Sequence, residues 1–412
     1  MKIVIAPDSF KECLPAAAVA QAMARGVLDV YPDAVLDLCP MADGGEGTVE
    51  AMVAATGGRL LTADVFDPLG KPIRAHWGLL GESGGALLPG ELGLLGAAVA
   101  GEADGDASTQ GSSPAPPQGA AVIEMAAASG LHLVPAEHRD PLRTTSFGTG
   151  QLIRAALDEG ATKIILGIGG SATVDGGAGA AQALGVTFLD GRGQLMVCGL
   201  GGGALADIGR IDLSGLDERL AGVAIHIACD VKNPLTGVNG AATVFGPQKG
   251  ATPEMVDLLD RGLSHWAGIL RAQLGKDVEF IPGAGAAGGL GAGLLALCGG
   301  KLESGLTIVA QTVGLKRRLT GADLVFTGEG RLDHSSRFGK TAVGVAELAR
   351  AAGAATVCIP GQITDDAPRD LFDGGVYPLT DPQTPPRAAM LRAADLLTQR
   401  AAAAMREFLK KR

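Results

Sequence analysis

The sequence predicts an α/β fold, in which a second, mixed-sheet α/β domain is inserted into a doubly wound parallel sheet domain. Short apolar runs end abruptly at Gly, Asp or Ser, as buried parallel strands do. Helical patterns with apolar residues three or four positions apart follow most of these runs. Two other regions alternate apolar and polar residues or form hairpin-like patterns, which indicates a second sheet of mixed direction.

The first domain is expected to contain strands at Lys2–Ala6, Leu36–Met41, Lys163–Ile168, Asp323–Thr327 and Thr356–Pro360. Helices are expected at Ala16–Leu28, at Thr149–Glu159 and at Lys340–Ala352. Gly160 and Gly353 directly follow the last two, as helix-ending glycines commonly do. Because strands and helices alternate in this way, ligand loops are expected at the carboxyl ends of the strands.

The inserted domain is expected to begin with a hairpin over Arg59–Leu80 and a strand at Ala120–Ala126. Its second part has a hairpin-like stretch at Phe188–Gly193 and a strand at Val223–Cys229. We therefore assign residues 1–60, 139–184 and 284–412 to the first domain and residues 61–138 and 185–283 to the inserted one. Residues 81–119 are rich in Gly, Ala, Ser and Pro and are expected to form a mobile insertion loop.

Composition excludes several classes of protein. Of 412 residues, 47% are apolar, which is too many for a disordered chain, and 64 are glycine. A net charge of −10 argues against a nucleic-acid partner, because no excess of basic residues is present. The N-terminal apolar run is too short for a signal peptide, and the uncharged stretch Phe280–Gly300 is too weakly apolar to span a bilayer. The six cysteines lack metal-ligand spacing and are expected to be free thiols. A cytoplasmic protein without a membrane or nucleic-acid partner is expected.

Loops rich in acids, glycines and hydroxyls follow the expected strands. Asp8, Ser9 and Lys11 come directly after the first strand, although Asp8 and Ser9 could simply cap a helix. Asp43 and Glu46 lie among three glycines, where their carboxylates could bind a metal through oxygen or belong to a plain turn. Residues 167–179 combine glycines and hydroxyls before a helix, which is typical of a phosphate-binding loop, and Asp175 lies inside it.

Two further motifs suggest other functions, but each signal is weak. Gly283, Gly285 and Gly288 match the spacing of a dinucleotide-binding loop, which would make the protein a nicotinamide-dependent dehydrogenase. Gly339-Lys340-Thr341 resembles the end of a P-loop, but the earlier glycine of that motif is replaced by His334. Another possible function is that of a carbohydrate- or anion-binding regulator without turnover. The acidic loops argue against it, because simple binding needs no metal site.

These motifs resemble those of the type I glycerate kinase family. The matching segments, which cover nearly the whole chain except residues 81–119, are Ile5–Glu12, Ala42–Thr48, Gly167–Thr173, Asp175–Gly179, Ala228–Val231, Asn233–Leu235, Phe245–Ala251, Pro282–Gly289 and Thr327–Arg331. The resemblance implies a Rossmann/flavodoxin-like domain with a second α/β domain inserted and an active site in the cleft between them. It implies phosphoryl transfer from ATP, with Mg²⁺, to D-glycerate, giving 2-phospho-D-glycerate. Formation of 3-phosphoglycerate, or another small hydroxy acid as substrate, stays open, as does a monomer or a homodimer.

On this basis candidate residues can be assigned to roles. Lys11, Asp175 and Asp230 are the catalytic candidates, and Asp175 is slightly favoured as the base. Arg331 is expected to bind the glycerate carboxylate, because its guanidinium offers two parallel donors. The remaining substrate-binding candidates are Asp8, Ser9, Lys249 and Asn233; the nucleotide-binding candidates are Gly169, Gly170, Ser171, Thr173, Gly285 and Gly288; and the metal candidates are Asp43, Glu46 and Glu329.

Overall fold

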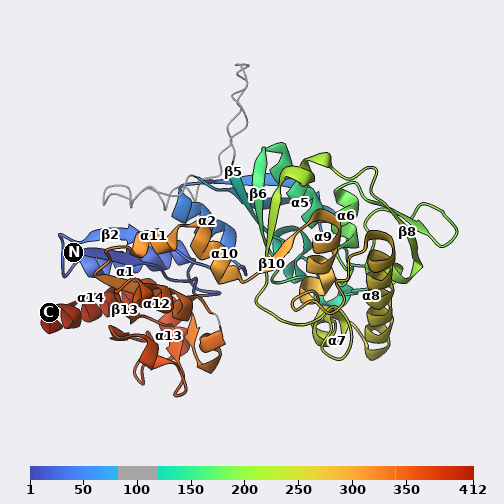
Figure 1. The fold of residues 1–412 in the computed structure, drawn as a ribbon. Helices are drawn as coiled ribbons and strands as arrows, with labels where there is room; N and C mark the ends of the chain where they lie inside the picture. The colour runs from blue at the N-terminus through green and yellow to red at the C-terminus, as the bar shows by residue number, and fades with distance from the viewer. Residues whose placement is uncertain (82–118, 339) are drawn as a thin grey trace, which may run out of the picture.

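Two lobes, each built on its own sheet, make up the computed structural model of the chain (Figure 1). The structure describes residues 1–81, 119–338 and 340–412, so nearly all of the expected insertion 81–119 lies outside the described residues. Both chain ends belong to the lobe drawn in blue and red, and the other lobe is drawn mainly in green and yellow.

The first lobe holds a five-stranded sheet in which every pair of neighbours is parallel. Its order is β15-β13-β11-β1-β2, the doubly wound arrangement that the sequence predicts. The strand bounds are β1 (Lys2–Ile5), β2 (Val35–Leu38), β11 (Leu324–Thr327), β13 (Ala355–Cys358) and β15 (Gly375–Val376). Beside this sheet, β12 (Arg331–Leu332) and β14 (Gln362–Ile363) form a short parallel pair.

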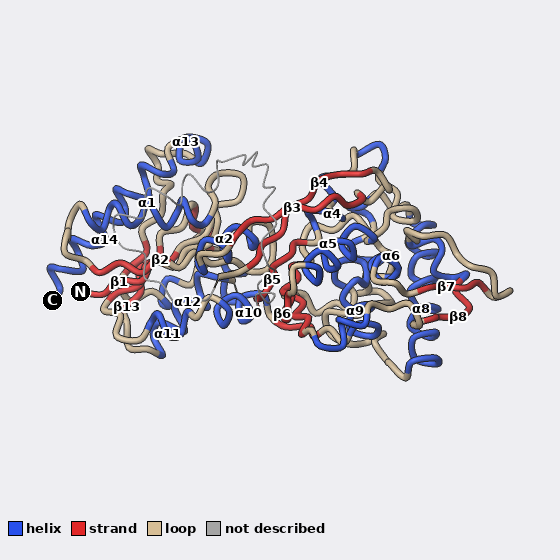
Figure 2. The backbone as a smooth tube through the Cα atoms, turned by 90° about the horizontal axis from the view of Figure 1, so that it is seen from above, coloured by secondary structure: helices blue, strands red, loops and turns tan. Residues whose placement is uncertain are grey.

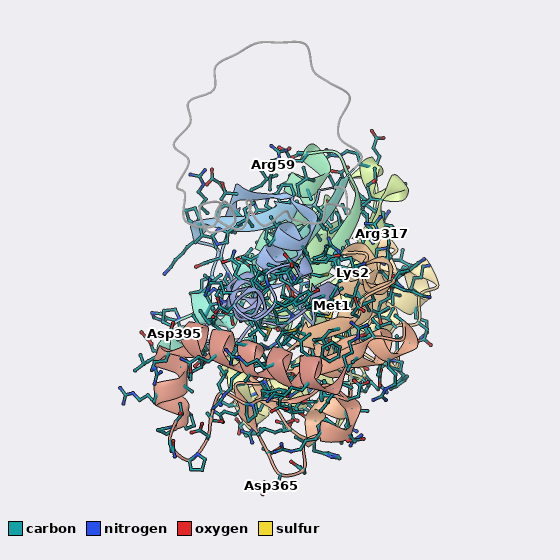
Figure 3. The ribbon with its side chains drawn as sticks, turned by 90° about the vertical axis from the view of Figure 1, so that its left-hand side faces the viewer. Met1, Lys2, Arg59, Arg317, Asp365 and Asp395 are labelled. Atoms are coloured by element: carbon teal, nitrogen blue, oxygen red, sulfur yellow. The ribbon has the colours of Figure 1, made fainter. Side chains whose placement is uncertain are left out.

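Helices α1 (Ala16–Leu28) and α14 (Ala393–Lys411) cover one face of this sheet. Their buried side chains, among them Met23 and Leu397, pack with Ile3 and Ile5 of β1 in one apolar cluster. Figure 3 views this end of the molecule, with Met1 and Lys2 at the start of β1 and Asp395 on α14.

The second lobe holds a six-stranded mixed sheet of order β10-β9-β6-β5-β4-β3. Its β3–β4–β5 part is antiparallel, and its β5–β6–β9–β10 part is parallel. The bounds are β3 (Arg59–Phe66), β4 (Pro72–Leu79), β5 (Gly119–Glu124), β6 (Ala161–Gly167), β9 (Ala224–Ala228) and β10 (Lys301–Glu303). A separate antiparallel pair is formed by β7 (Thr187–Asp190) and β8 (Ile208–Asp212).

The helices of the second lobe pack around its main core. These are α4 (Ala126–Ser129), α5 (Phe147–Asp158), α6 (Ala178–Ala183), α7 (Ala241–Phe245), α8 (Pro253–Leu274) and α9 (Leu290–Cys298). Trp266 of α8 is fully buried there, against Phe188 of β7. Helix α9 follows the glycine-rich segment 282–289 and is almost wholly buried.

A third apolar cluster joins the two lobes. It contains Val4 and Val325 from the first sheet and Val122, Ile165 and Ala228 from the second. Four helices contribute to it, namely α2 (Thr48–Thr56), α10 (Gly305–Thr312), α11 (Leu315–Leu319) and α12 (Thr341–Ala351). Figure 2 shows α2 and α10 in the region where the two lobes meet. Side chains from both sheets therefore share one continuous core.

The mixed sheet contains two strands from segments that the sequence assigns to the first domain. Strand β6, expected in the first domain within residues 139–184, pairs with β5 and β9 in the mixed sheet. Strand β10, within residues 284–412, pairs with β9 of the same sheet. A buried apolar run looks the same in either sheet, so its spacing does not reveal its partner. The stretch Val278–Ile281, which is strand-like in the sequence, forms no strand.

Within the described ranges, no helix is both long and apolar enough to cross a membrane. All six cysteines are free, in agreement with expectation. Cys39, Cys298 and Cys358 are buried, while Cys198 is exposed.

Candidate active site

Two cavities adjoin at the carboxyl ends of the parallel strands of the two sheets. The first, of about 340 Å³, is lined by loops that follow β1, β11 and β13, and we call it cavity 1. Cavity 2, of about 390 Å³, is lined by loops that follow β6 and β9 and by the segment around Lys249. Among the described residues, Lys11 and Asp43 line both, so the cavities meet at these two side chains.

Asp8 lies in cavity 1 at the end of β1 and is buried. Its carboxylate accepts hydrogen bonds from the Thr341 hydroxyl and from the Ser9 backbone N–H, both at 2.6 Å. Burial raises the pKa of Asp8 to about 6, and the nearby charge of Asp43 adds to this effect. Asp8 therefore joins the loop after β1 to the start of α12, rather than capping a helix of its own.

Glu329, in the loop after β11, is a second buried acid of cavity 1. Burial raises its pKa to about 7. Its Oε1 atom is buried without a hydrogen-bond partner among the described residues. A buried carboxylate oxygen without a partner is costly, so this atom is a candidate to contact an ion or a ligand.

Two partly or fully exposed cations also line cavity 1. Arg331 and Lys340 both line it, and both pair with Asp333, at 3.4 Å and 3.3 Å. The Arg331 side chain is 61% exposed, so its ion pair leaves most of the guanidinium free for a ligand.

The loop that carries Asp43 is fixed by its own hydrogen bonds and by one between the following helix and the second lobe. Asp43 Oδ1 accepts the Gly45 N–H at 3.0 Å, and the Thr48 hydroxyl donates to the Gly45 carbonyl at 2.7 Å. Glu124 of β5 accepts the Val49 N–H at 3.0 Å, which anchors the start of α2 to the second lobe. Glu46, a metal candidate from the same loop, is exposed and lines neither cavity.

Asp230 lies at the end of β9 and lines cavity 2. Its Oδ1 accepts the Gly305 N–H at 3.0 Å, and partial burial raises its pKa. A Cβ atom at Gly305 would overlap the Asp43 carbonyl oxygen and lie 3.1 Å from Asp230 Oδ2. The first residue of α10 therefore holds Asp43 and Asp230 close together because it has no side chain.

Lys249 is the buried cation of cavity 2. Its ammonium donates to the Ser171 hydroxyl and to the Thr173 carbonyl, both at 2.7 Å. Burial lowers the pKa of Lys249 to about 7, and the charge of Asp175 opposes this shift. Gly169, Gly170 and Ser171 line the same cavity, as the candidate phosphate-binding loop requires, whereas Thr173 does not.

Asp175 does not fit the role of base that the sequence favoured. It is fully buried and lines neither cavity. Its carboxylate accepts the backbone N–H and the hydroxyl of Ser146, each at 2.7 Å, and the Gly177 N–H at 3.1 Å. The carboxylate of Asp175 is thus engaged with its own loop and lies outside both cavities, whereas Asp230 lines cavity 2.

Three more candidates, Asn233, Gly285 and Gly288, line neither cavity. The Asn233 side chain donates to the Asn239 carbonyl at 2.8 Å and lines neither cavity. A Cβ at Gly285 would overlap the Pro234 carbonyl, and one at Gly288 would overlap that of Thr173. The glycines of the GxGxxG pattern thus allow close packing of the chain on itself, and no strand precedes them, so the dehydrogenase interpretation loses its structural basis.

Sequence reasoning missed several residues of the site. Lys340 and Thr341 were recognised at the start of a helix and compared with a P-loop, but they were given no role in the site. Gln248 lines cavity 2 beside Lys249. Nothing in the sequence links Glu124 with α2, because that hydrogen bond joins residues 75 positions apart.

The acids fit a metal that is shared with a ligand. No cluster of three or more ligating side chains stands close enough to hold a metal on its own within the described part of the chain. Mg²⁺ is usually bound by one or two carboxylates together with phosphate oxygens. Asp8 and Asp43, whose charges influence one another, and the unpaired Glu329 Oε1 supply oxygens suited to that arrangement in cavity 1.

Comparison with known proteins gives the glycerate kinase family. The model of the glycerate kinase family matches residues 3–409. Glycerate 2-kinase of Escherichia coli is 50% identical over 366 residues, which cover 89% of this chain and 86% of that protein. Glycerate kinase of Bacillus subtilis is 48% identical, over 89% and 86% of the two chains. A crystal structure described as glycerate kinase 2 from Salmonella typhimurium LT2 superposes with a TM-score of 0.84 at 44% identity, covering 100% of this chain and 99% of that one. The chain therefore belongs to the glycerate kinase family and is an enzyme, a kinase.

Proposed function

We propose that this glycerate kinase transfers the terminal phosphoryl group of ATP, in the presence of Mg²⁺, to the 2-hydroxyl of D-glycerate. The observation that carries the proposal is the meeting of two cavities at Lys11 and Asp43. A transferase needs two substrates whose reacting atoms face one another, and phosphoryl transfer needs a cation and acids for the metal at that point.

The chain's own residues support this reaction at the junction. Lys11 is exposed to both cavities, so its ammonium can offset negative charge on the phosphoryl group as it moves. Asp230, held by the Gly305 N–H, accepts the proton of the substrate hydroxyl. That oxygen then forms the new bond to phosphorus while the bond between phosphorus and the leaving ADP oxygen breaks.

Asp8, Asp43 and Glu329 are the residues that would hold Mg²⁺. When bound, the metal ion supplies charge neutralisation on the phosphate oxygens. The 2-position is favoured by the 50% identity to a glycerate 2-kinase.

The test is release of ADP from MgATP that depends on D-glycerate. Wild-type protein is expected to turn over, and Lys11→Met is expected to lose nearly all activity with an unchanged melting temperature, because Lys11 is exposed. Reduction of NAD⁺ by D-glycerate, measured at the nicotinamide absorbance, is the counter-assay and is expected to be absent. ADP release without any dependence on D-glycerate would refute the proposal.

A further inference from the structure

We propose that the nucleotide occupies cavity 1 and that glycerate occupies cavity 2. This assignment rests on the proposed function. It reverses the sequence-based expectation, which placed the phosphates at Gly169–Thr173 and the glycerate carboxylate at Arg331.

Cavity 1 has an apolar wall that a three-carbon acid does not need. Leu379, Pro386 and Met390 line it, the last two from α13 (Pro386–Leu391). Met390 is 45% exposed although it lies in a cavity wall, so a flat apolar group would cover it. An adenine ring is such a group, and a methionine side chain adapts readily to an aromatic face.

The charges of cavity 1 match a metal-bound polyphosphate. Lys11, Arg331 and Lys340 provide three cations, and Asp8 and Glu329 stand among them. Triphosphate carries several negative charges together with a divalent metal, so it calls for both kinds of side chain in one place. Glu329, whose buried Oε1 has no hydrogen-bond partner among the residues that the structure describes, lines this cavity and not the other.

The sheet topology favours the same cavity. Strand order β11-β1-β2 places β1 at the point where the chain reverses its direction of winding. In open parallel sheets, ligands bind outside the carboxyl ends of the strands at this switch point. The loops after β1 and β11, which hold Asp8 and Glu329, line cavity 1 there.

Cavity 2 is equipped for a small monoanion with hydroxyl groups. Apart from the shared Lys11 it holds one cation, Lys249, whose ammonium has three donors and uses two on Ser171 and Thr173. The third donor is available for a carboxylate. The Gln248 side chain adds an amide group to the lining of cavity 2. Asp230 lines the same cavity and would accept the proton of the reacting hydroxyl.

Calorimetric titration with ADP, together with the KM for D-glycerate, separates the two assignments. Met390→Asp places a charge on the proposed adenine wall and is expected to raise the Kd for ADP by about tenfold or more while the KM for glycerate changes less than about twofold. Leu391→Asp is the matched control, because Leu391 is 84% exposed on the same helix and does not line the cavity. It is expected to change neither value.

Gln248→Ala is the reciprocal variant in cavity 2. It is expected to raise the KM for glycerate and to leave the Kd for ADP unchanged. If Gln248→Ala weakens ADP binding and Met390→Asp does not, the assignment is overturned while the kinase function stands. If wild-type protein binds no ADP at all, both the assignment and the proposed function fail.

Discussion

Lys11 and Asp43 lie against the same residue, Gly45, at the junction of the two cavities. A Cβ atom built at Gly45 would be 3.7 Å from Lys11 Nζ and 3.0 Å from Asp43 Oδ1. The cation comes from the loop after β1, and the acid comes from the loop after β2. The loops after two neighbouring strands of the first sheet thus place opposite charges close together where the two cavities meet. Loops of the second lobe line cavity 2 on the other side of this junction.

Asp43→Asn is expected to raise the Mg²⁺ concentration needed for half-maximal rate by about tenfold or more and to lower kcat, because a neutral amide oxygen replaces a charged ligand. The measurement is the initial rate as a function of Mg²⁺ at saturating substrates. Glu46→Gln is the control from the same loop. It is expected to behave as wild type, because Glu46 is exposed and lines neither cavity. A normal Mg²⁺ midpoint in Asp43→Asn would transfer the metal role to Glu329 and Asp8.

Asp230→Asn and Asp175→Asn are expected to fail in different ways. Loss of the base in Asp230→Asn lowers kcat by about 10²–10⁴-fold with little change in melting temperature. Asp175→Asn weakens buried hydrogen bonds to Ser146 and Gly177, so its melting temperature falls while the folded enzyme keeps most of its kcat. Thermal unfolding and single-turnover rates measured on the same samples distinguish the two. A larger loss of kcat in Asp175→Asn would restore the original assignment.

The pKa of Lys249 predicts opposite effects of pH on binding and on stability. Burial lowers this pKa to about 7, so the ammonium of the free enzyme loses its proton as pH rises through 7. Affinity for anionic glycerate in cavity 2 is then expected to fall above pH 7, seen as a falling limb in kcat/KM. Asp175 is the charged group that opposes the shift.

Stability is expected to move the other way. Between pH 7 and about 10 the unfolded chain keeps a proton on this lysine that the folded chain has released, so the free energy of unfolding rises with pH. The comparison is the melting temperature of wild type and Lys249→Met across this range. A constant difference between the two proteins would show that Lys249 does not titrate there.

Gly26→Ala is expected to destabilise the protein by about 1–3 kcal/mol. A Cβ at Gly26 of α1 would overlap the Thr398 carbonyl oxygen of α14, so the two helices would have to separate. Gly268→Ala is the matched control, since Gly268 lies inside α8 and a Cβ there meets nothing within 4 Å. It is expected to stabilise the protein by up to about 1 kcal/mol. Chemical denaturation of both variants checks the pair, and equal effects would contradict the packing account.

The local pattern of the sequence predicted the four longer strands of the first sheet and helices α1 and α12, but not α14. Helix α1 has the predicted bounds, and strands β1, β11 and β13 lie within about two residues of the predicted ones. Sheet membership was harder to predict, because β6 is an apolar run that either sheet could accept. Its partners β5 and β9 are fixed by long-range packing, which no local spacing records.

The sequence predicted which loops form the site, but not which of their side chains face a cavity. Asp8, Lys11, Asp43 and Asp230 were identified because each follows a strand, where ligand loops gather. Asp175 looked equivalent in sequence, yet Ser146 and Gly177 enclose it. Whether an acid in a glycine-rich loop faces a cavity or the chain itself depends on contacts from distant segments, and the same holds for Gly285 and Gly288.

Proton-coupled ³¹P NMR of the product formed from D-glycerate and MgATP tests the central claim most directly. A phosphate on the 2-hydroxyl couples to one carbon-bound proton and gives a doublet, whereas a phosphate on the 3-hydroxyl couples to two and gives a triplet. The account predicts a doublet that grows with ADP and is absent from Lys11→Met. A triplet, or no new phosphomonoester signal dependent on D-glycerate, would contradict it.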